Sequence, residues 1–408
     1  MAGTECRQSL RPPLRSLRIL SDLCVKSLYA VADLGGSSAM TSKRAALNDT
    51  ERRAWLRLAR TQNVGPTTFA ALLARFGCAA AALAEVPRLA QRGGGSGPLR
   101  IPSDADTGRE LDALERLGGR LIACCEPDFP QGLVALDPPP PVISVLGRSD
   151  LLKSEMIAIV GARNASALGR KFATQIATDL GRAGFVVVSG MARGIDTAAH
   201  EGSLPSGTCA AVAGGVDIIY PPENAGLYER MKVQGLIVSE MPVGLSPQAR
   251  HFPRRNRIIS GLARGVVIVE AAEGSGSLIT ANFALEQGRE VFAVPGSPLD
   301  PRAKGTNRLI REGATLTESA DDVISGLRSP AGRMFREPDA APEPFGADDA
   351  DADRIRREIE ELLGPSPVEI DELVRQCGAT VPAVLIVLLE LELAGRVHRH
   401  SGNRVSLG

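Results

Sequence analysis

The sequence of 408 residues is poor in residue types and motifs on which several common activities depend. It holds four histidines, three tyrosines and one tryptophan, and aromatic residues make up 3% of it. HExxH, GxSxG and Walker A motifs are absent, which argues against a zinc protease, an α/β-hydrolase and a P-loop nucleotidase. The seven cysteines form no CxxC pair, which fits unpaired thiols in a reducing cytoplasm. We therefore expect no metal site, no cofactor and no enzymatic activity.

Long hydrophobic runs are absent as well. No stretch of 18 or more apolar residues occurs, so the sequence predicts no transmembrane helix, and we expect a cytoplasmic protein. Net charge is zero, but residues 337–353 hold seven acids and no lysine or arginine, which leaves the remainder at +7. A neutral total therefore does not exclude an anionic partner.

Composition and periodicity divide the chain into five segments. They are an N-terminal extension (1–47), a helical domain (48–117), an α/β core (118–328), an acidic linker rich in proline and alanine that is predicted to be disordered (329–353), and a C-terminal domain (354–408). Three interpretations of the extension compete: a transit peptide, a disordered arm, or a stretch upstream of a misassigned start. Met40 begins a more natural opening, which favours the last.

The helical domain contains two predicted helices. Trp55 and Leu58 have helical spacing, residues 63–66 break the pattern, and a second helix extends from Phe69 to Phe76. A helix, a turn with glycine and a helix can present N–H groups to a phosphate, as helix-hairpin-helix modules do. A plain helical packing domain is the alternative. Residues 91–107 are rich in glycine, serine and proline and predict a loop.

In the core, short β-branched runs alternate with helical stretches. The predicted strands are 156–160, 185–189, 209–213, 236–239, 266–269 and 291–294, and the predicted helices include 168–183 and 195–202. Strands this apolar, separated by helices, predict a parallel sheet that is covered on both faces.

The C-terminal domain has the pattern of a winged helix. Three helical stretches, the last two at 367–377 and 381–394, precede two short strands around a glycine turn. The third helix has no lysine, arginine, asparagine or glutamine, and its charges are Glu390 and Glu392, so it is unsuited to reading base edges. It is apolar on more than one face. We expect it to bury one face internally and another against a second copy or the core.

Two strand-to-helix loops of the core are suited to binding phosphate. The first, IVGARNASALGR at 159–170, follows a strand and opens a helix, where Arg163 and Ser166 can donate to an anion at the helix N-terminus. Its spacing is not GxGxxG, so a dinucleotide is not favoured. The second, VSGMARGIDTAAH at 188–200, has the same context, and Asp196 is predicted to cap the following helix. His200 is interpreted as a structural histidine.

An arginine-rich segment provides the sharpest signal. Residues 241–269 contain five arginines and His251 but no acid, and Phe252 lies among them as a possible stacking platform. Arginines plus an aromatic residue beside a phosphate loop are what a single-stranded nucleic acid site requires. A solvated basic loop with Phe252 in the core is the alternative. A fourth segment, residues 270–288, begins with Glu270, expected to orient nearby polar side chains, and a Gly-Ser-Gly-Ser nest before a helix.

Together these segments resemble the DprA family, also called Smf, the DNA processing proteins. The resemblance rests on IVGARNASALG, VSGMARGIDTAAH, AGGVDIIYPPEN, HFPRRNRIISGLARGVVIVEA, SGSLITA and GREVFAVPG, which occur in this order over residues 118–328. It implies an extended Rossmann-like core between an N-terminal domain related to SAM and helix-hairpin-helix modules and a C-terminal winged helix. It also implies sequence-independent binding of single-stranded DNA, a homodimer, and loading of the RecA recombinase in natural transformation.

The resemblance also implies site residues. Gly161, Arg163, Ser166 and Gly169 match the first phosphate-binding loop, and Arg250 and Phe252 lie near the basic and aromatic residues that hold the strand; many relatives have lysine just before this point. The full expected site is Gly161, Ala162, Arg163, Ser166, Gly169, Ser189, Gly190, Arg193, Gly194, Arg250, Phe252, Arg254, Arg255, Asn256, Arg257, Gly274, Ser275, Gly276 and Ser277. The rival function is a nucleoside monophosphate phosphoribohydrolase of the same fold, but the sequence lacks the PGGxGTxxE spacing that supplies its catalytic glutamate.

Overall fold

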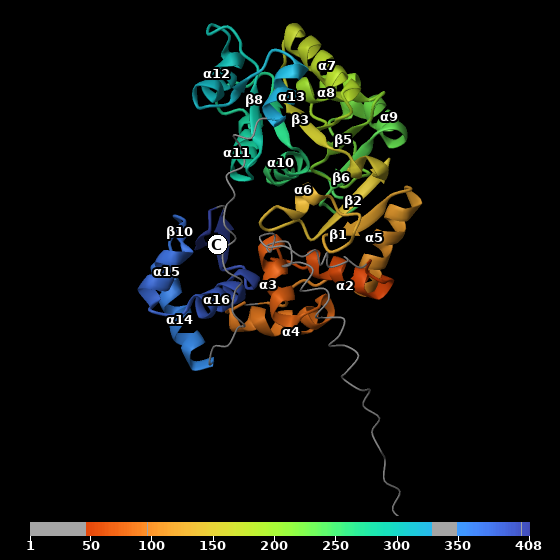
Figure 1. Ribbon diagram of the computed structural model, residues 1–408. Helices are drawn as coiled ribbons and strands as arrows, with labels where there is room; N and C mark the ends of the chain where they lie inside the picture. Colours follow the sequence, from red (N-terminus) through yellow and green to blue (C-terminus); the bar gives the residue numbers. More distant parts are fainter. Residues whose placement is uncertain (1–45, 96, 329–348, 401) are drawn as a thin grey trace, which may run out of the picture. The chain divides into compact units, whose positions relative to one another are not determined.

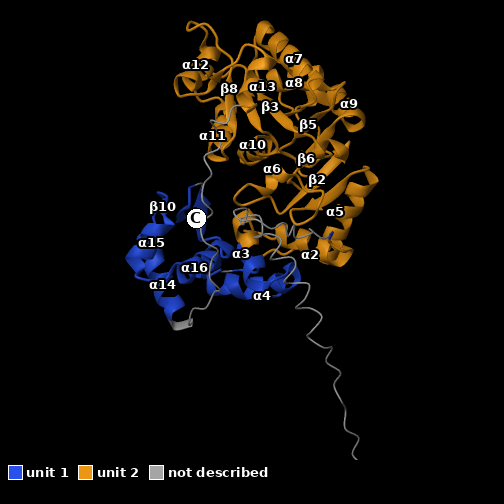
Figure 2. Cartoon of the chain, viewed as in Figure 1, with its two compact units in different colours: residues 1–46, 71–98, 338–408 blue, residues 47–70, 99–337 orange. Residues whose placement is uncertain are grey.

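The computed structural model describes residues 46–95, 97–328, 349–400 and 402–408. They form two compact units (Figure 2). Of the described residues, the sheet unit contains 47–70 and 99–328, and the winged unit contains 46, 71–95, 97–98, 349–400 and 402–408. The predictions for residues 1–45 and 329–348 lie outside the described residues.

The sheet unit is built around nine strands (Figure 1). The strands are β1 (Arg120–Ala123), β2 (Val142–Gly147), β3 (Met156–Val160), β4 (Val186–Ser189), β5 (Thr208–Ala211), β6 (Leu236–Ser239), β7 (Gly265–Ile268), β8 (Glu290–Ala293) and β9 (Thr315–Leu316). They lie in the order β1-β2-β6-β5-β4-β3-β7-β8-β9. The pairs from β6 to β9 are parallel, whereas β2 is antiparallel to both β1 and β6. The predicted α/β class is therefore confirmed.

Helices cover the sheet. They are α6 (Gln131–Val134), α7 (Ala167–Arg182), α8 (Ile195–Ser203), α9 (Ala225–Gln234), α10 (His251–Leu262), α11 (Gly276–Glu286), α12 (Lys304–Arg311) and α13 (Ala320–Arg328), with 3-10 turns η1 (Ser149–Lys153), η2 (Pro222–Asn224) and η3 (Pro301–Ala303). Helices α7, α8 and α13 share one buried apolar cluster with β3, β4, β7 and β8. Helices α10 and α11 pack against each other and against β3, β7 and β8. Burial of β3 is complete, as the unbroken run Met156–Val160 predicts.

The predicted core strands agree with β3 to β8 within a few residues. Strands β1, β2 and β9 were not predicted. β9 is only two residues long, so its apolar pattern is too short to be distinctive, whereas β1 was overlooked although it is as long as β4 to β8. β2 and β6 pair in antiparallel fashion, a relation between residues about 90 positions apart that no local pattern encodes.

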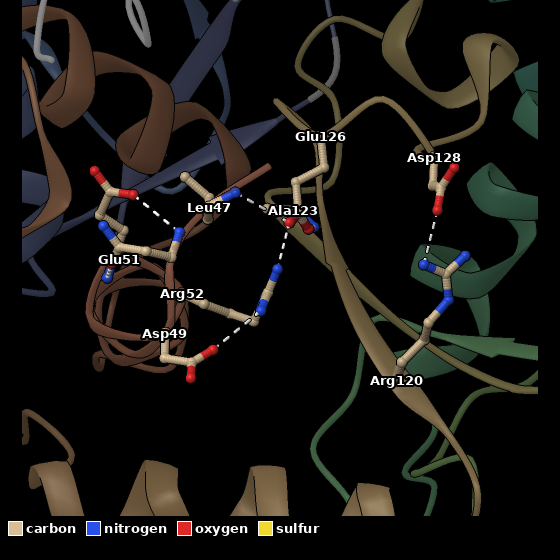
Figure 3. Close-up of polar contacts among 9 residues, drawn as sticks. Leu47, Asp49, Glu51, Arg52, Arg120, Ala123, Glu126 and Asp128 are labelled. Atoms are coloured by element: carbon tan, nitrogen blue, oxygen red, sulfur yellow. Dashed lines mark hydrogen bonds and ion pairs between the residues drawn. The ribbon is translucent and has the colours of Figure 1, made fainter. Parts of the chain in front are cut away.

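The first helix of the sheet unit is joined to the sheet by polar contacts. Helix α2 (Asp49–Ala59) begins with a capping box between Asn48 and Glu51. Glu126, which follows β1 and is 5% exposed, accepts hydrogen bonds from the Leu47 amide at 3.2 Å, the Ala123 amide at 2.8 Å and the Arg52 guanidinium at 2.5 Å (Figure 3). The second helix, α5 (Asp104–Arg116), has its own capping box at Ser103. The buried carboxylate therefore anchors α2 against β1.

The winged unit combines an N-terminal helix with the C-terminal domain. Helix α3 (Pro66–Phe76) crosses the boundary between the units, and α4 (Ala79–Arg92) lies within the winged unit. The C-terminal elements are α14 (Asp349–Leu362), β10 (Val368–Glu369), α15 (Ile370–Cys377), α16 (Val381–Leu393), β11 (Val397–His400) and β12 (Arg404–Leu407). The three strands form one sheet in the order β10-β12-β11, so three helices and a wing are present as predicted.

The environment of α16 differs from the expectation. Within the winged unit α16 packs against α4, so its second apolar face is covered by neither a second copy nor the core. Glu390 is 1% exposed and pairs with Arg356 at 2.6 Å and Arg92 at 3.8 Å, and Glu392 pairs with Arg399 at 3.1 Å. Neither carboxylate is a bare surface charge.

Helix α14 begins at Asp349, inside the stretch that was predicted as linker. An ion pair between Asp353 and Arg356, three residues apart, stabilises the N-terminal turns of this helix. The composition of the segment does not indicate this spacing of opposite charges. No single helix in the described part of the chain is long and apolar enough to cross a membrane. None of the five described cysteines forms a disulfide.

Candidate nucleic-acid interface

A hollow of about 240 Å³ lies beyond the carboxyl ends of β3, β4 and β5. Its walls come from five segments: the β3–α7 loop, the β4–α8 loop, the stretch that follows β5, the β6–α10 loop, and α10. The lining residues are Arg163, Gly190, Ala192, Arg193, Val212, Ala213, Gly214, Ile218, Tyr220, Pro221, Pro222, Glu223, Pro247, Phe252 and Arg255. One part of this wall is apolar and aromatic, and the other carries guanidinium groups. Such a wall suits a ligand unit that is flat and apolar at one end and anionic at the other.

Phe252 is at the centre of the aromatic part. The Arg163 guanidinium carbon lies 5.4 Å from the Phe252 ring centroid, and that of Arg255 lies 6.0 Å away. The Tyr220 ring lies 5.7 Å from the Phe252 ring, tilted by 54°. Phe252 is thus half-buried and already engaged by two cations and another ring. The structure brings Arg163, Phe252 and Arg255 together as the sequence predicts.

Tyr220 was not identified as a site residue from the sequence. It is 46% exposed, lines the hollow and presents its ring to solvent, in contrast to the buried Tyr228. The only available signal was its place in YPPEN, directly before two prolines that also line the hollow. An exposed aromatic ring next to cationic groups is an accessible stacking surface.

Arg255 is a buried cation in the wall of the hollow. It is 7% exposed and donates to the Ala211 carbonyl at 3.3 Å. Burial lowers the pKa of its guanidinium, and the nearby Asp196 carboxylate opposes this. A Cβ atom on Gly190 would overlap the Arg255 guanidinium, so glycine is required there. The buried positive charge is therefore held in place by the β4–α8 loop.

Asp196 has a different role from the one predicted. Gly194, not Asp196, precedes the first residue of α8. The Asp196 carboxylate instead accepts hydrogen bonds from the amides of Gly190 at 3.1 Å and Ala192 at 3.2 Å. Burial raises its pKa, and Arg255 and these amides oppose the rise. Because these loop amides donate to the Asp196 carboxylate, they are not available to a ligand. The group in this loop that can contribute positive charge to a ligand is the guanidinium of Arg193.

His200 is structural, as predicted. Its side chain is fully buried, and its Nδ1 lies 2.8 Å from the Thr208 hydroxyl. Burial and the proximity of Arg255 lower its pKa to about 3, so the ring is neutral at physiological pH. Ser189 is also fully buried and donates to the Ile159 carbonyl, which leaves its hydroxyl unable to bind a ligand.

Ser166 and Gly169 serve the fold rather than the hollow. The Ser166 hydroxyl and amide donate to the Glu270 carboxylate at 2.6 and 2.9 Å, and the hydroxyl also accepts from the Gly169 amide, which caps α7. A Cβ atom on Gly169 would lie 2.6 Å from this carboxylate. Ser166 was expected to bind phosphate, and Glu270 was expected to orient arginine or asparagine. Instead, the Glu270 carboxylate accepts the hydrogen bonds that the Ser166 hydroxyl and amide donate.

The remaining predicted residues fall into four groups. Arg250 and Arg254 are exposed. Each is close in sequence to Phe252, which lines the hollow, but neither arginine lines it. Arg257 turns to Glu240, with which it forms an ion pair at 2.7 Å, and to the Pro138 carbonyl. The nest at 274–277 opens α11 and contacts Asn256, whose amide donates to the Gly276 carbonyl, but it does not line the hollow. Gly161, Ala162 and Gly194 support the loops without lining the hollow.

The hollow has little of what hydrolysis requires. Glu223 is the carboxylate in its lining, and it pairs with Arg193 at 3.5 Å. Glu286 closes AEGSGSLITANFALE, the stretch that corresponds to the catalytic loop of the phosphoribohydrolases, and it is at the end of α11 and outside this lining. No group of three or more histidine, cysteine, aspartate or glutamate side chains suited to a metal ion occurs among the described residues.

Three family models match the chain in succession. They are described as "DprA-like N-terminal HHH domain" over residues 49–113, "DNA recombination-mediator protein A" over 120–328 and "DprA winged helix domain" over 340–403. The chain is 44% identical to the DNA processing protein DprA of Bacillus subtilis over 222 residues, which cover 54% of this chain and 75% of that protein. It is 38% identical to the protein Smf of Escherichia coli over 298 residues, covering 72% and 79%. The crystal structure of DprA from Streptococcus pneumoniae matches with a TM-score of 0.56 and 31% identity, over 69% of this chain and 98% of that one.

Proposed function

The chain belongs to the DprA family, also called Smf, and on that premise we propose that it binds single-stranded DNA without reading its sequence and loads a RecA-type recombinase onto the bound strand. Two of the relatives named above, those of Bacillus subtilis and Streptococcus pneumoniae, are DNA processing proteins by name. The single observation that carries the proposal is the hollow in which Arg163 and Arg255 flank Phe252 beside the exposed ring of Tyr220.

The chemistry of the hollow favours a single strand over a duplex. Base stacking on an aromatic ring requires an unpaired base, and every base has a face that can stack. Guanidinium groups beside the ring can hold the neighbouring phosphate through charge-assisted hydrogen bonds. At about 240 Å³ the hollow is smaller than the roughly 300–1,000 Å³ typical of sites that enclose a whole small ligand, which suits one unit of a polymer.

We assign the stacking surface to Tyr220 and the supporting role to Phe252. The Phe252 ring is half-buried and already contacts two guanidinium groups, whereas the Tyr220 ring is 46% exposed. A base that enters from solvent therefore meets Tyr220 first. Phe252 holds Arg163 and Arg255 in position for the phosphate.

Further parts of the proposal follow from the family. We propose a cytoplasmic homodimer that acts in DNA uptake and recombination and has no catalytic activity. Strand β9 is an edge of the sheet and carries Leu316, which is 46% exposed, so this edge is a suitable surface for a second copy.

The test is a titration of the full chain with oligothymidine and with duplex of equal length, at several salt concentrations. We expect tighter binding of the single strand and an affinity that falls steeply with salt, because phosphate contacts release counterions. Equal affinity for the two forms would refute the single-strand proposal. Release of ribose phosphate from nucleoside monophosphates, abolished by Glu286→Ala, would favour the hydrolase instead.

A further inference from the structure

A second hollow, here called the α7–α8 groove, lies beside the first. Its volume is about 390 Å³, and it lies between the N-terminal turns of α7 and α8. Arg170, Lys171 and Thr174 line it from α7, Thr197 and Glu201 from α8, and Asn224 from the end of η2. Apart from Arg193 and Gly194 at its border, none of these residues belongs to the site predicted from the sequence.

The groove has an unbalanced positive charge. Lys171 is exposed, and no hydrogen bond or ion pair joins it to another described residue. Arg170 uses one nitrogen to donate to the Ala165 carbonyl at 2.8 Å, which holds it at the groove. Glu201, the acid in the lining, is paired with Arg230 at 3.2 Å. An anionic ligand is therefore favoured.

Arg193 connects the two hollows, because it lines both of them. Its side chain is 56% exposed, and its pairing with Glu223 at 3.5 Å is between two exposed groups, so it costs little to exchange for a phosphate. A polyanion that leaves the first hollow across Arg193 enters the groove without meeting an unpaired carboxylate.

We propose that the α7–α8 groove is a second subsite, which binds the sugar–phosphate backbone of the strand whose base occupies the first hollow. Lys171 and Arg170 contact phosphates there. The uncharged side chains of Thr174, Thr197 and Asn224, which donate hydrogen bonds to backbone carbonyls, form the floor. No aromatic residue lines the groove, so it holds the backbone and not the bases. This inference rests on the proposed function. It adds the path of the strand, which leaves the first hollow across Arg193 and continues along the α7–α8 groove.

The experiment measures the affinity of the full chain for oligothymidines from about 4 to about 30 nucleotides, which bracket the 4–16 nucleotides of typical single-strand sites. Lys171→Ala removes an exposed side chain that has no hydrogen bond or ion pair with another described residue. Loss of one phosphate contact lowers the salt slope by about 0.7 for a single strand. We expect this decrease with long oligonucleotides and no change with the shortest, because only a long strand reaches the groove. Lys171→Arg should restore the slope.

Arg182→Ala is the matched control. It removes one positive charge from the other end of α7, where Arg182 is 75% exposed and pairs with Asp179. Equal effects of Lys171→Ala and Arg182→Ala, or an effect of Lys171→Ala that is independent of length, would overturn the subsite. If the unmodified chain binds and Lys171→Ala leaves the slope unchanged at every length, this inference alone fails. If the unmodified chain binds no single strand, the proposed function fails with it.

Discussion

The Ser166 hydroxyl and the Glu270 carboxylate, 104 residues apart in the chain, are joined by a 2.6 Å hydrogen bond. Ser166 follows β3 and Glu270 follows β7, and these two strands are neighbours in the sheet. The chain continues from β3 through α7 to β4 on one side of this pair, and from β7 through α11 to β8 on the other side. This is the point at which open α/β sheets usually bind ligands. In this protein the hydrogen bond between Ser166 and Glu270 lies at that point, and the hollow lies beyond the ends of β3, β4 and β5 instead.

Ser166→Ala should reduce stability and leave DNA binding nearly unchanged. The substitution removes the cap of α7, which costs about 1 kcal/mol, and leaves part of the Glu270 carboxylate without its donor. Urea unfolding measures the first effect, and the salt slope for oligothymidine measures the second. A slope lowered by about 0.7, as expected for the loss of one phosphate contact, would place Ser166 on the phosphate after all.

Tyr220→Leu should weaken binding only where a base is present to stack. We expect a loss of about 1–3 kcal/mol with oligothymidine and a much smaller loss with an abasic strand of equal length, while Tyr220→Phe should bind like the unmodified chain. A double-mutant cycle between residue and base isolates the stacking contribution. Equal losses on both strands would show that Tyr220 acts through the shape of the hollow.

Arg254 and Arg257 should differ although they are three residues apart. Arg257→Ala leaves the Glu240 carboxylate, which is 6% exposed, without its ion-pair partner, and breaking such a buried pair costs about 3–5 kcal/mol. Arg254→Ala removes an exposed side chain and should change stability by no more than about 0.5 kcal/mol while it lowers the salt slope. Chemical unfolding and salt titration of the two variants separate the roles. Similar stability in both would contradict the assignment.

Gly93→Ala should loosen the contact between α4 and α16. A Cβ atom there would overlap the carbonyl oxygen of Glu390, whereas Gly97 has no neighbour within 4 Å and serves as control. Overpacking of this kind costs about 1–3 kcal/mol. We expect Gly93→Ala, but not Gly97→Ala, to increase hydrogen exchange in α4 and α16. Unchanged exchange would mean that the helices separate readily in solution.

Much of this protein follows from short-range pattern. Apolar runs bounded by glycine predict strands β3 to β8, and the spacing of Trp55 and Leu58 predicts α2, because backbone periodicity is a local property. The cluster of Arg163, Phe252 and Arg255 follows too. Arg163 is in the loop after β3, Phe252 and Arg255 are in the first turns of α10, the helix after β6, and segments that follow parallel strands begin at one edge of the sheet. Motif order was sufficient to predict the family.

The uses of individual polar side chains were decided by tertiary structure. Ser166, Asp196 and Arg257 were all expected in other roles, and each is engaged by a group that the local sequence does not indicate: Glu270, the amides of the β4–α8 loop, and Glu240. The same holds for α16, whose apolar face is covered by α4 from far earlier in the chain. A buried charge or hydrogen-bond donor requires a partner, and the tertiary structure decides which group that partner is. The role of such a side chain therefore depends on contacts between residues distant in sequence.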